Sequence, residues 1–345
     1  MLYTEYISIK NVVVHFVGNK LNQDDITISK GVLDIDSEKE KTLLDYYLSS
    51  FQTEEHYQFY HDSNLELNEV YSYISQIFDK PEDIYKQSIN LAKHLYNSSV
   101  HPKIKGGEFY VVYFKDCILD GDNVDAIGLF KAENKDTFLK ILLTDGIFNL
   151  ETESGTNIKK LDKGCLIFNK EKENGFIVEV VDNINKSIEA QFWIDNFLHV
   201  RSRKNAYSNT ENVMTMAKKF VMNELPKDYE ISKNDQIDLL NKSLEFFKEK
   251  EEFNLDDFTN DVISEPEIIE KFNQYKLEFE QHNDLIIDDQ FIISEPARKK
   301  QQRSYKRVIR LDNKIRIVID GNSNHIQQGE DGSGKYYKIY YKEEL

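Results

Sequence analysis

The chain has 345 residues, of which 40% are apolar, 12% aromatic and 30% charged, and its formal net charge is −17 at pH 7. This apolar content excludes a disordered chain, and the length exceeds what one hydrophobic core usually covers, so we expect two globular domains. Neither a basic segment followed by an apolar one at the start nor a run of eighteen apolar residues occurs in the sequence, which argues against a signal peptide and a membrane span.

The first third of the chain predicts strands followed by helices. Residues 5–18 are rich in β-branched side chains and end at a glycine, which is typical of one or two strands. Apolar residues at helical spacing then predict helices at 37–51, 68–78 and 81–98. His15 lies in the strand segment with no second ligand at metal-binding spacing, so we expect a core or edge histidine.

The stretch from Lys105 to Arg203 holds the densest alternation of Val, Ile, Phe and Tyr and the only tryptophan, so it should form the largest core. Its short apolar runs are separated by Asp, Gly and Asn, a pattern typical of an antiparallel meander. The runs lie at residues 106–115, 126–132, 164–168 and 175–181. With helices on one side of this sheet, residues 1–206 are predicted to form an α+β domain.

Both cysteines, Cys117 and Cys165, lie in this stretch. Each is inside an apolar run, and CxxC spacing is absent. They are predicted to be small buried hydrophobes in a reducing cytoplasm, forming neither a disulfide nor a zinc site.

Residues 207–345 are predicted to form a second domain, an acidic helical block followed by a small antiparallel β-hairpin sheet. Thr210 is expected to cap a helix whose three methionines fill the core. Ser232 and Asp235 predict the start of another helix, and a further helix is expected at 265–279. Strands are predicted at 284–288, 291–293, 305–311, 314–319 and 336–341, with a turn at residues 312–313.

Charge changes sign within this second domain. Residues 207–297 carry 9 Lys and Arg against 22 Asp and Glu (−13), whereas residues 298–316 carry 9 against 1 (+8). Cations clustered in this way are typical of a surface that neutralises phosphates. An equally supported alternative is that they pair with the acidic helices of the same domain. The acidic helices could also present a face to a basic protein.

The basic segment is the predicted DNA-binding site, with contacts to the phosphate backbone and little readout of bases. The predicted residues are Arg298, Lys299, Lys300, Arg303, Lys306, Arg307, Arg310 and Arg316, together with Arg201, Arg203 and Lys204. The last three follow the tryptophan segment, where they could contact phosphate or simply favour the end of a helix.

Three motifs suggest catalysis or metal binding, and none is complete. Residues 329–335 match the GxxxxGK half of a phosphate-binding loop, but Tyr336 replaces the Ser or Thr that would bind Mg²⁺, so a hairpin turn is expected. A metal nuclease would use Asp162 and Glu179, yet no lysine follows Glu179 at the required spacing. Residues 251–257 are acidic but lack the ligand pattern and mid-loop glycine of an EF-hand. We therefore expect neither an enzyme nor a metal or other cofactor.

Four features together carry a resemblance to a known family. They are an N-terminal α+β half, residues 107–112 (Gly-Glu-Phe-Tyr-Val-Val), residues 192–198 (Phe-Trp-Ile-Asp-Asn-Phe-Leu) followed by Arg201 to Lys204, and a terminal β-hairpin. In this order, over most of the chain, they resemble the bacterial 37-kilodalton nucleoid-associated protein family. The resemblance implies association with the nucleoid in the cytoplasm, binding to double-stranded DNA, dimerisation and no catalysis. The chain departs from the family in its acidity, which argues against simple nonspecific coating of DNA.

A competing interpretation is a protein-interaction scaffold, for instance a component of a DNA-processing or phage-defence assembly. Its acidic helical block would then mimic nucleic acid or bind a partner. The expected partners are double-stranded DNA, proteins that act on DNA and a second copy of the chain, with no membrane contact.

Overall fold

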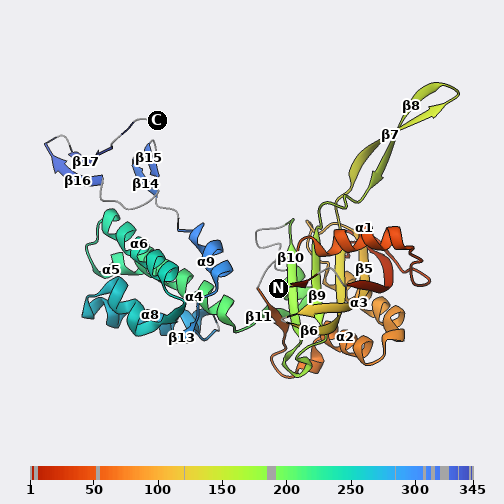
Figure 1. Ribbon diagram of the computed structural model, residues 1–345, viewed down its shortest axis with the longest axis horizontal. Helices are drawn as coiled ribbons and strands as arrows, with labels where there is room; N and C mark the ends of the chain where they lie inside the picture. Colours follow the sequence, from red (N-terminus) through yellow and green to blue (C-terminus); the bar gives the residue numbers. More distant parts are fainter. Residues whose placement is uncertain are drawn as a thin grey trace. The chain divides into compact units, whose positions relative to one another are not determined.

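The computed structural model describes residues 2–3, 7–51, 55–119, 121–184, 192–283, 285–305, 308–311, 315–318, 326–332, 334–341 and 343. The chain divides into two compact units, Met1–Arg203 and Lys204–Leu345 (Figure 1). Antiparallel sheets combined with helices make the fold α+β, as predicted.

A nine-stranded antiparallel sheet forms the centre of the first unit. Its strand order is β11-β4-β10-β9-β6-β5-β2-β3, and β1 pairs with β5 beside this path. The strands are β1 (Leu2–Tyr3), β2 (Ser8–Val17), β3 (Ile26–Thr27), β4 (Tyr57–Phe59), β5 (Gly107–Leu119), β6 (Asp122–Ala132), β9 (Lys163–Phe168), β10 (Ile177–Asp182) and β11 (Val200–Ser202). The four runs predicted as a meander are β5, β6, β9 and β10, which lie next to one another in that order and confirm the prediction.

Helices cover both faces of this sheet, so the prediction of one covered face is wrong. The helices are α1 (Ser37–Leu48), α2 (Glu69–Asp79) and α3 (Ile84–Ser98), with 3₁₀ turns at Leu65–Leu67, Pro81–Asp83 and Lys172–Asn174. α1 packs on the face that carries Val12 and Phe130, while α2 and α3 pack on the face that carries Val13 and Leu129. Neighbouring strand residues point to opposite faces, so strands that are apolar at every position are covered on both.

The predicted core around the tryptophan is confirmed. Trp193 is fully buried in a π-helical segment, Phe192–Leu198, and packs in the cluster formed by α2, α3 and the sheet. Its indole N–H donates to the Gly164 carbonyl of β9 at 3.4 Å. A buried indole needs such an acceptor because water cannot reach it.

His15 and both cysteines are buried in this unit, as predicted. The His15 Nε2 lies 2.9 Å from the Ser88 hydroxyl, and its Nδ1 accepts the Ser29 N–H at 3.1 Å. Burial lowers the pKa of His15 to about 4. Cys117 and Cys165 are free thiols, and burial raises the pKa of each.

One long hairpin of the first unit projects away from the nine-stranded sheet (Figure 1). β7 (Asp136–Thr144) and β8 (Ile147–Gly155) pair with each other, and within the described residues neither pairs with a third strand. Asp145 and Gly146 have φ of 53° and 80°, the positive values that both central residues of a type I′ turn require. Residues 136–155 are called the arm below.

The second unit is mainly helical. Its helices are α4 (Ala206–Lys219), α5 (Leu225–Asp228), α6 (Lys233–Glu249), α7 (Leu255–Phe258), α8 (Pro266–Asn283) and α9 (Glu295–Gln302), with π-helical segments at Phe220–Glu224 and Thr259–Ile263. Its strand pairs are β12 (Glu252–Asn254) with β13 (Gln290–Ile292), β14 (Val308–Leu311) with β15 (Ile315–Val318), and β16 (Ile326–Asp331) with β17 (Gly334–Ile339). Met214 and Met216 are buried and Met222 packs against the same core, so the methionines fill the core as predicted.

Local capping explains two helix starts of this unit. Ser232 and Asp235 form the predicted capping box of α6. α4 is capped by Asn205, whose side chain accepts the Ser208 N–H, so the prediction that Thr210 caps it is wrong. Thr210 instead lies inside the helix, where its hydroxyl donates to the Ala206 carbonyl and accepts the Ser294 N–H.

The prediction that the chain is all strand from residue 284 onward, apart from turns, is wrong. The described residues 285–288 form no strand, whereas β13, β14, β15 and β17 coincide with predicted strands. Residues 295–302, which lie between two predicted strands, form α9. The start of the basic segment therefore lies on a helix.

Candidate nucleic-acid interface

α9 carries the first cations of the basic segment. Ser294 caps it by accepting the Ala297 N–H, Pro296 lies in its first turn, and Ala297 is buried against the helical core. Lys299 and Lys300 fall in its last turn, where the helix dipole favours positive charge.

The three cations of α9 have carboxylate partners. Arg298 lies 3.7 Å and Lys299 2.6 Å from Glu295, and Lys300 lies 3.1 Å from Glu211 of α4. Hydrogen bonding to Lys299 lowers the pKa of Glu295. Both side chains of the Lys299–Glu295 pair are 64% exposed, and ion pairs in such positions contribute little to stability because water screens them. Pairing therefore weakens the positive field of α9 but leaves its lysines at the surface.

Arg303 follows α9 at an anchored part of the backbone. The buried Tyr305 hydroxyl donates to the Met214 carbonyl at 2.5 Å, and the Lys218 ammonium donates to the Ser304 carbonyl at 2.6 Å. Burial raises the pKa of Tyr305 and lowers that of Lys218. The Arg303 side chain is exposed, and in the described part of the chain no ion pair involves it. Arg303 is thus an exposed cation next to backbone that hydrogen bonds hold in place.

The β14–β15 hairpin holds two more of the predicted residues. Its backbone register places Arg310 opposite Arg316. Leu311 and Ile317 of the same hairpin pack against Ile237 of α6. Apolar contacts therefore attach this basic hairpin to the helical body of the second unit.

Arg201 lies on β11, the edge strand of the nine-stranded sheet. Its side chain is exposed, and its guanidinium lies 5.2 Å from the centroid of the Tyr60 ring. The His199 ring is 4.5 Å from Tyr60 and 6.2 Å from His61. Cations next to aromatic rings are a common surface for nucleic acid. Tyr60 and His61 come from a segment far from Arg201 in the chain, so no sequence pattern could reveal them as its neighbours.

Arg203 and Lys204 have partners of their own. Arg203 pairs with Glu171, and this hydrogen bond lowers the pKa of the carboxyl. The Lys204 ammonium lies 2.6 Å from Asp288, whose pKa it lowers. Arg203 is the last residue of the first unit, whereas Lys204 belongs to the second.

The structure thus groups part of the predicted set. The second unit holds Arg298, Lys299 and Lys300 on α9, Arg303 just after it, and Arg310 and Arg316 on the hairpin. Lys306 and Arg307 lie outside the described residues. Arg201 and Arg203 belong to the first unit.

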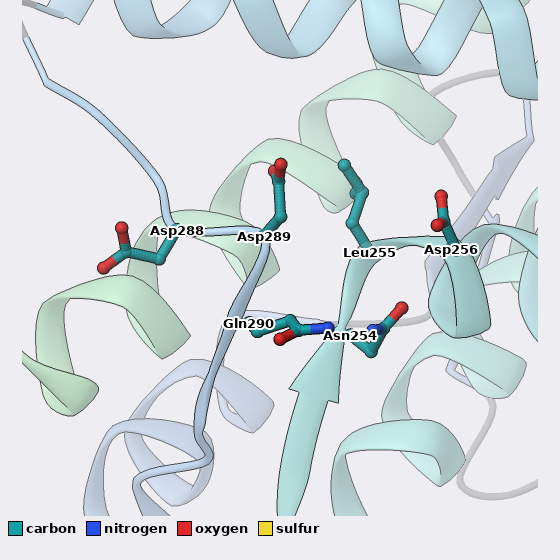
Figure 2. A pocket seen from close by; sticks show the side chains of 6 residues that line it. All are labelled: Asn254, Leu255, Asp256, Asp288, Asp289 and Gln290. Carbon is teal, nitrogen blue, oxygen red and sulfur yellow. The ribbon is translucent and has the colours of Figure 1, made fainter.

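An acidic cleft of about 320 Å³ lies elsewhere in the second unit (Figure 2). It is lined by Asn254, Leu255, Asp256, Asp288, Asp289 and Gln290. Lys276 is 3.1 Å from Asp289; its burial disfavours the charged form, but hydrogen bonds to Glu280 and Asp289 outweigh this and raise its pKa. Carboxylates repel phosphate, so this cleft is unsuited to DNA. Among the residues that the structure describes, no group of three His, Cys, Asp or Glu is arranged to hold a metal.

α8 presents a second acidic surface. Glu267, Glu270 and Glu278 are exposed along this helix and line a cleft together with Glu224 and Asp228 of the preceding segment. Such a surface attracts a basic partner and repels nucleic acid.

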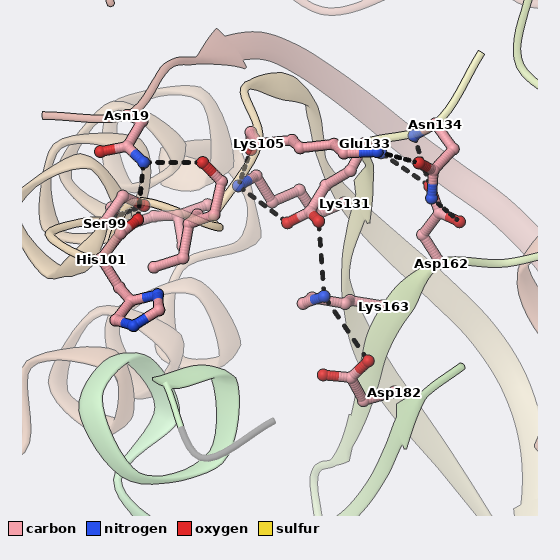
Figure 3. Close-up of polar contacts among 12 residues, drawn as sticks. Asn19, Ser99, His101, Lys105, Lys131, Glu133, Asn134, Asp162, Lys163 and Asp182 are labelled. Carbon is pink, nitrogen blue, oxygen red and sulfur yellow. Dashed lines mark hydrogen bonds and ion pairs between the residues drawn. The ribbon is translucent and has the colours of Figure 1, made fainter. Parts of the chain in front are cut away.

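The first unit contains a buried network of charges (Figure 3). Lys131 and Lys163 are fully buried, and Glu133 lies 3.1 Å from the first and 3.4 Å from the second. Lys163 also lies 3.5 Å from Asp182. Burial lowers the pKa of Lys131. Because opposite charges alternate through the network, each buried ion is compensated, which is the condition for keeping such groups in a core.

Asp162, Glu179 and the described part of residues 329–335, candidates for catalysis or metal binding, make contacts that support the fold. Asp162 accepts the backbone N–H groups of Glu133 and Asn134 at 2.8 Å, and Glu179 lies 3.3 Å from His56. The described residues of the GxxxxGK segment include the paired ends of β16 and β17, which agrees with the predicted hairpin.

No helix within the described residues is long and apolar enough to cross a membrane. A family model described as nucleoid-associated protein YejK matches residues 13–336. A search of curated proteins finds no match to the chain.

Proposed function

Because the chain belongs to the nucleoid-associated protein YejK family, we propose that it is a non-catalytic DNA-binding protein of the bacterial nucleoid and therefore acts in the cytoplasm. We propose that it binds double-stranded DNA through the basic segment, residues 298–316. The proposed protein partners are a second copy of the chain and proteins that act on DNA.

The observation that carries this proposal is the local reversal of charge. In a chain of net charge −17, residues 298–316 hold nine cations and one acid. The acidic surfaces of α8 and of the Asp288–Asp289 cleft lie in the same unit and repel phosphate. A duplex would therefore be directed to the basic segment and away from the rest of this unit.

In the proposed contact, a DNA phosphate replaces the Glu295 carboxylate as the partner of Lys299. Lys299 forms an exposed pair with Glu295, which phosphate can replace at little cost. Arg303 is exposed on an anchored backbone, so ordering it on phosphate costs little additional backbone entropy. Contacts of this kind neutralise phosphates and do not read bases, so binding should depend strongly on salt and weakly on sequence.

Charge reversal at four positions tests the site. We expect the variant with Arg303, Lys306, Arg307 and Arg310 changed to Glu to bind a labelled 30-base-pair duplex at least tenfold more weakly in fluorescence anisotropy, since four phosphate contacts are replaced by repulsion. The matched control changes four exposed lysines of the first unit to Glu and so alters the net charge equally. These are Lys41, Lys103, Lys159 and Lys160.

The two variants separate a local site from a general effect of charge. The proposal predicts a large loss for the basic-segment variant and a small one for the control. Equal losses would mean that only net charge matters, and unchanged binding in the basic-segment variant would reject the site.

The second candidate function is a protein-interaction scaffold that uses the acidic surface of α8. It is favoured by the carboxylate partners of α9 cations and by the exposed Glu267, Glu270 and Glu278. Changing these three residues to Gln should raise duplex affinity if they only repel DNA. If the scaffold function is correct, the same variant loses proteins captured from a nuclease-treated lysate, while the wild type retains them.

A further inference from the structure

One face of the arm is apolar and exposed in its outer part, beyond Thr137, Thr152 and Ser154 near the base. The register pairs Leu139 with Thr152, Ile141 with Leu150 and Leu143 with Phe148, and residues directly opposite each other in a hairpin share a face. The five apolar side chains of this face are between 63% and 74% exposed: Leu139, Ile141, Leu143, Phe148 and Leu150. We call this set the apolar arm face.

The opposite face of the arm is mixed: it carries Phe138, Leu142 and Ile147, and it also holds all the charged residues of the two strands. It carries the Lys140–Glu153 ion pair, with a distance of 2.8 Å, and the exposed Asn149 and Glu151. The arm is therefore amphipathic, although within the described residues no core covers its apolar side. A two-stranded hairpin is marginally stable in water without a third strand or a packed surface. An exposed apolar strand pair is also an aggregation hazard unless something covers it.

We propose that the apolar arm face is covered by the same face of the arm in a second copy of the chain. This inference rests on the homodimer named under the proposed function and does not depend on the DNA contact. Identical faces that pack about a two-fold axis form a closed interface, which ends at two copies and prevents further aggregation.

Charge argues against nucleic acid or an anionic membrane as the occupant of this face. Residues 136–155 carry one lysine, Lys140, against Asp136, Asp145, Glu151 and Glu153, so the arm has a net charge of −3. Polyanions are repelled by such a segment. The charged residues of the strands alternate with the apolar arm face, and Asp145 lies in the turn, so face-to-face packing buries no charge.

The area is sufficient for a specific dimer. Burying a side chain of this size contributes ~1.5–3 kcal/mol at ~25 cal/mol per Å², which corresponds to ~100 Å². Because about two thirds of each side chain is exposed, five of them supply ~350 Å² per copy and ~700 Å² per pair. Because apolar atoms make up ~65% of homodimer interfaces, burial of neighbouring polar surface in that proportion would bring the total to ~1,100 Å². A specific interface needs about 1,000 Å².

The test compares two neighbouring substitutions in β8. Phe148→Glu places a charge on the apolar arm face, and Asn149→Glu places the same charge on the opposite face. The full-length protein and both variants are studied by sedimentation velocity from 1 to 100 μM. We expect the wild type and Asn149→Glu to be dimers, and Phe148→Glu to have a dimer dissociation constant at least tenfold higher. Both positions are exposed, so neither substitution disturbs a packed core.

Removal of the arm gives a second measurement. Asp136 and Gly155 are cross-strand partners at its base, so residues 137–154 can be replaced by Asn-Gly to close the chain. We expect this variant to be a monomer with an unchanged thermal transition of the remaining protein. A monomeric wild type at every concentration, or dimers that persist in Phe148→Glu and in the arm deletion, would overturn the proposal.

The dimer and the DNA contact should respond to salt in opposite directions, which distinguishes the two proposals. Raising NaCl from 0.1 to 0.5 M should strengthen the dimer, because it screens the repulsion between two acidic arms, and should weaken DNA binding. In addition, Phe148→Glu should retain the basic segment and its contact with DNA. A dimer that persists in Phe148→Glu contradicts only the arm interface. Duplex binding that is unchanged in the basic-segment variant contradicts only the DNA site.

Discussion

His15 makes the stability of the first unit depend on pH. The folded protein holds this residue neutral between the Ser88 hydroxyl and the Ser29 N–H, and burial lowers its pKa from the usual 6.5 to about 4. Between these two values the unfolded chain binds a proton that the folded chain does not. The stability that the folded chain gains from holding His15 neutral is therefore complete above pH 6.5 and is lost as the pH falls toward 4.

Replacing His15 by Gln should flatten this dependence. In the wild type the residue lowers the free energy of unfolding by up to about 1.4 kcal/mol per pH unit between pH 6.5 and 4. We expect His15→Gln to be less stable than the wild type at pH 7 but to lose less stability by pH 5, measured by urea unfolding. His101→Gln, at an exposed histidine, controls for the removal of an imidazole. Equal losses in wild type and His15→Gln would contradict this role.

The residue types of the basic segment could be read from the sequence, but their partners could not. The nine cations of residues 298–316 were identified from composition alone. That Lys300 pairs with Glu211, or that Arg201 lies over Tyr60, depends on contacts between distant segments. A single sequence contains no record of such contacts.

Among the elements, α9 was missed for a physical reason. The helix buries Ala297 and is otherwise polar, so it lacks the apolar period that reveals longer helices. The available signal was local, namely Ser294 as a cap followed by Pro296 in the first turn. The preceding Ile292 and Ile293 favoured a strand and masked it.

Ser294 should therefore be a measurable support of α9. Because its side chain accepts the Ala297 N–H, Ser294→Ala should lower the free energy of unfolding of the second unit by about 1 kcal/mol. Ser294→Thr keeps the hydroxyl and should restore most of this loss. Thermal or urea unfolding measures both variants. Identical midpoints for Ser294→Ala and the wild type would show that the cap contributes nothing.

The arm was also missed, although its signal was strong. Asp145-Gly146 between alternating apolar residues is typical of a type I′ hairpin, and both residues have the positive φ that this turn requires. The strands β5, β6, β9 and β10 were found because their apolar runs are buried on both sides. The arm alternates apolar and polar residues around a face that this chain leaves exposed.

In the whole molecule, the basic segment and the apolar arm face lie in different parts of the chain, and we propose a different partner for each. The α+β class and the succession of a sheet-rich and a helical region were predictable, because apolar periodicity changes along the sequence. The coverage of both sheet faces by helices could not be predicted from the sequence, since it depends on where α1 packs. The family match supports association with the nucleoid, the basic segment supports a contact with DNA, and the arm supports a pair of copies.

The most direct measurement is the salt dependence of duplex binding by the intact protein. We predict that the logarithm of the binding constant falls linearly with the logarithm of the salt concentration, with a slope of roughly −4 to −8, because each of the cations in the basic segment that neutralises a phosphate contributes about −0.9. The four-residue variant of the basic segment should have a slope shallower by about 3 to 4. A wild type that binds no duplex at low salt, or a slope that the variant leaves unchanged, would contradict the central claim that residues 298–316 hold this acidic protein on DNA.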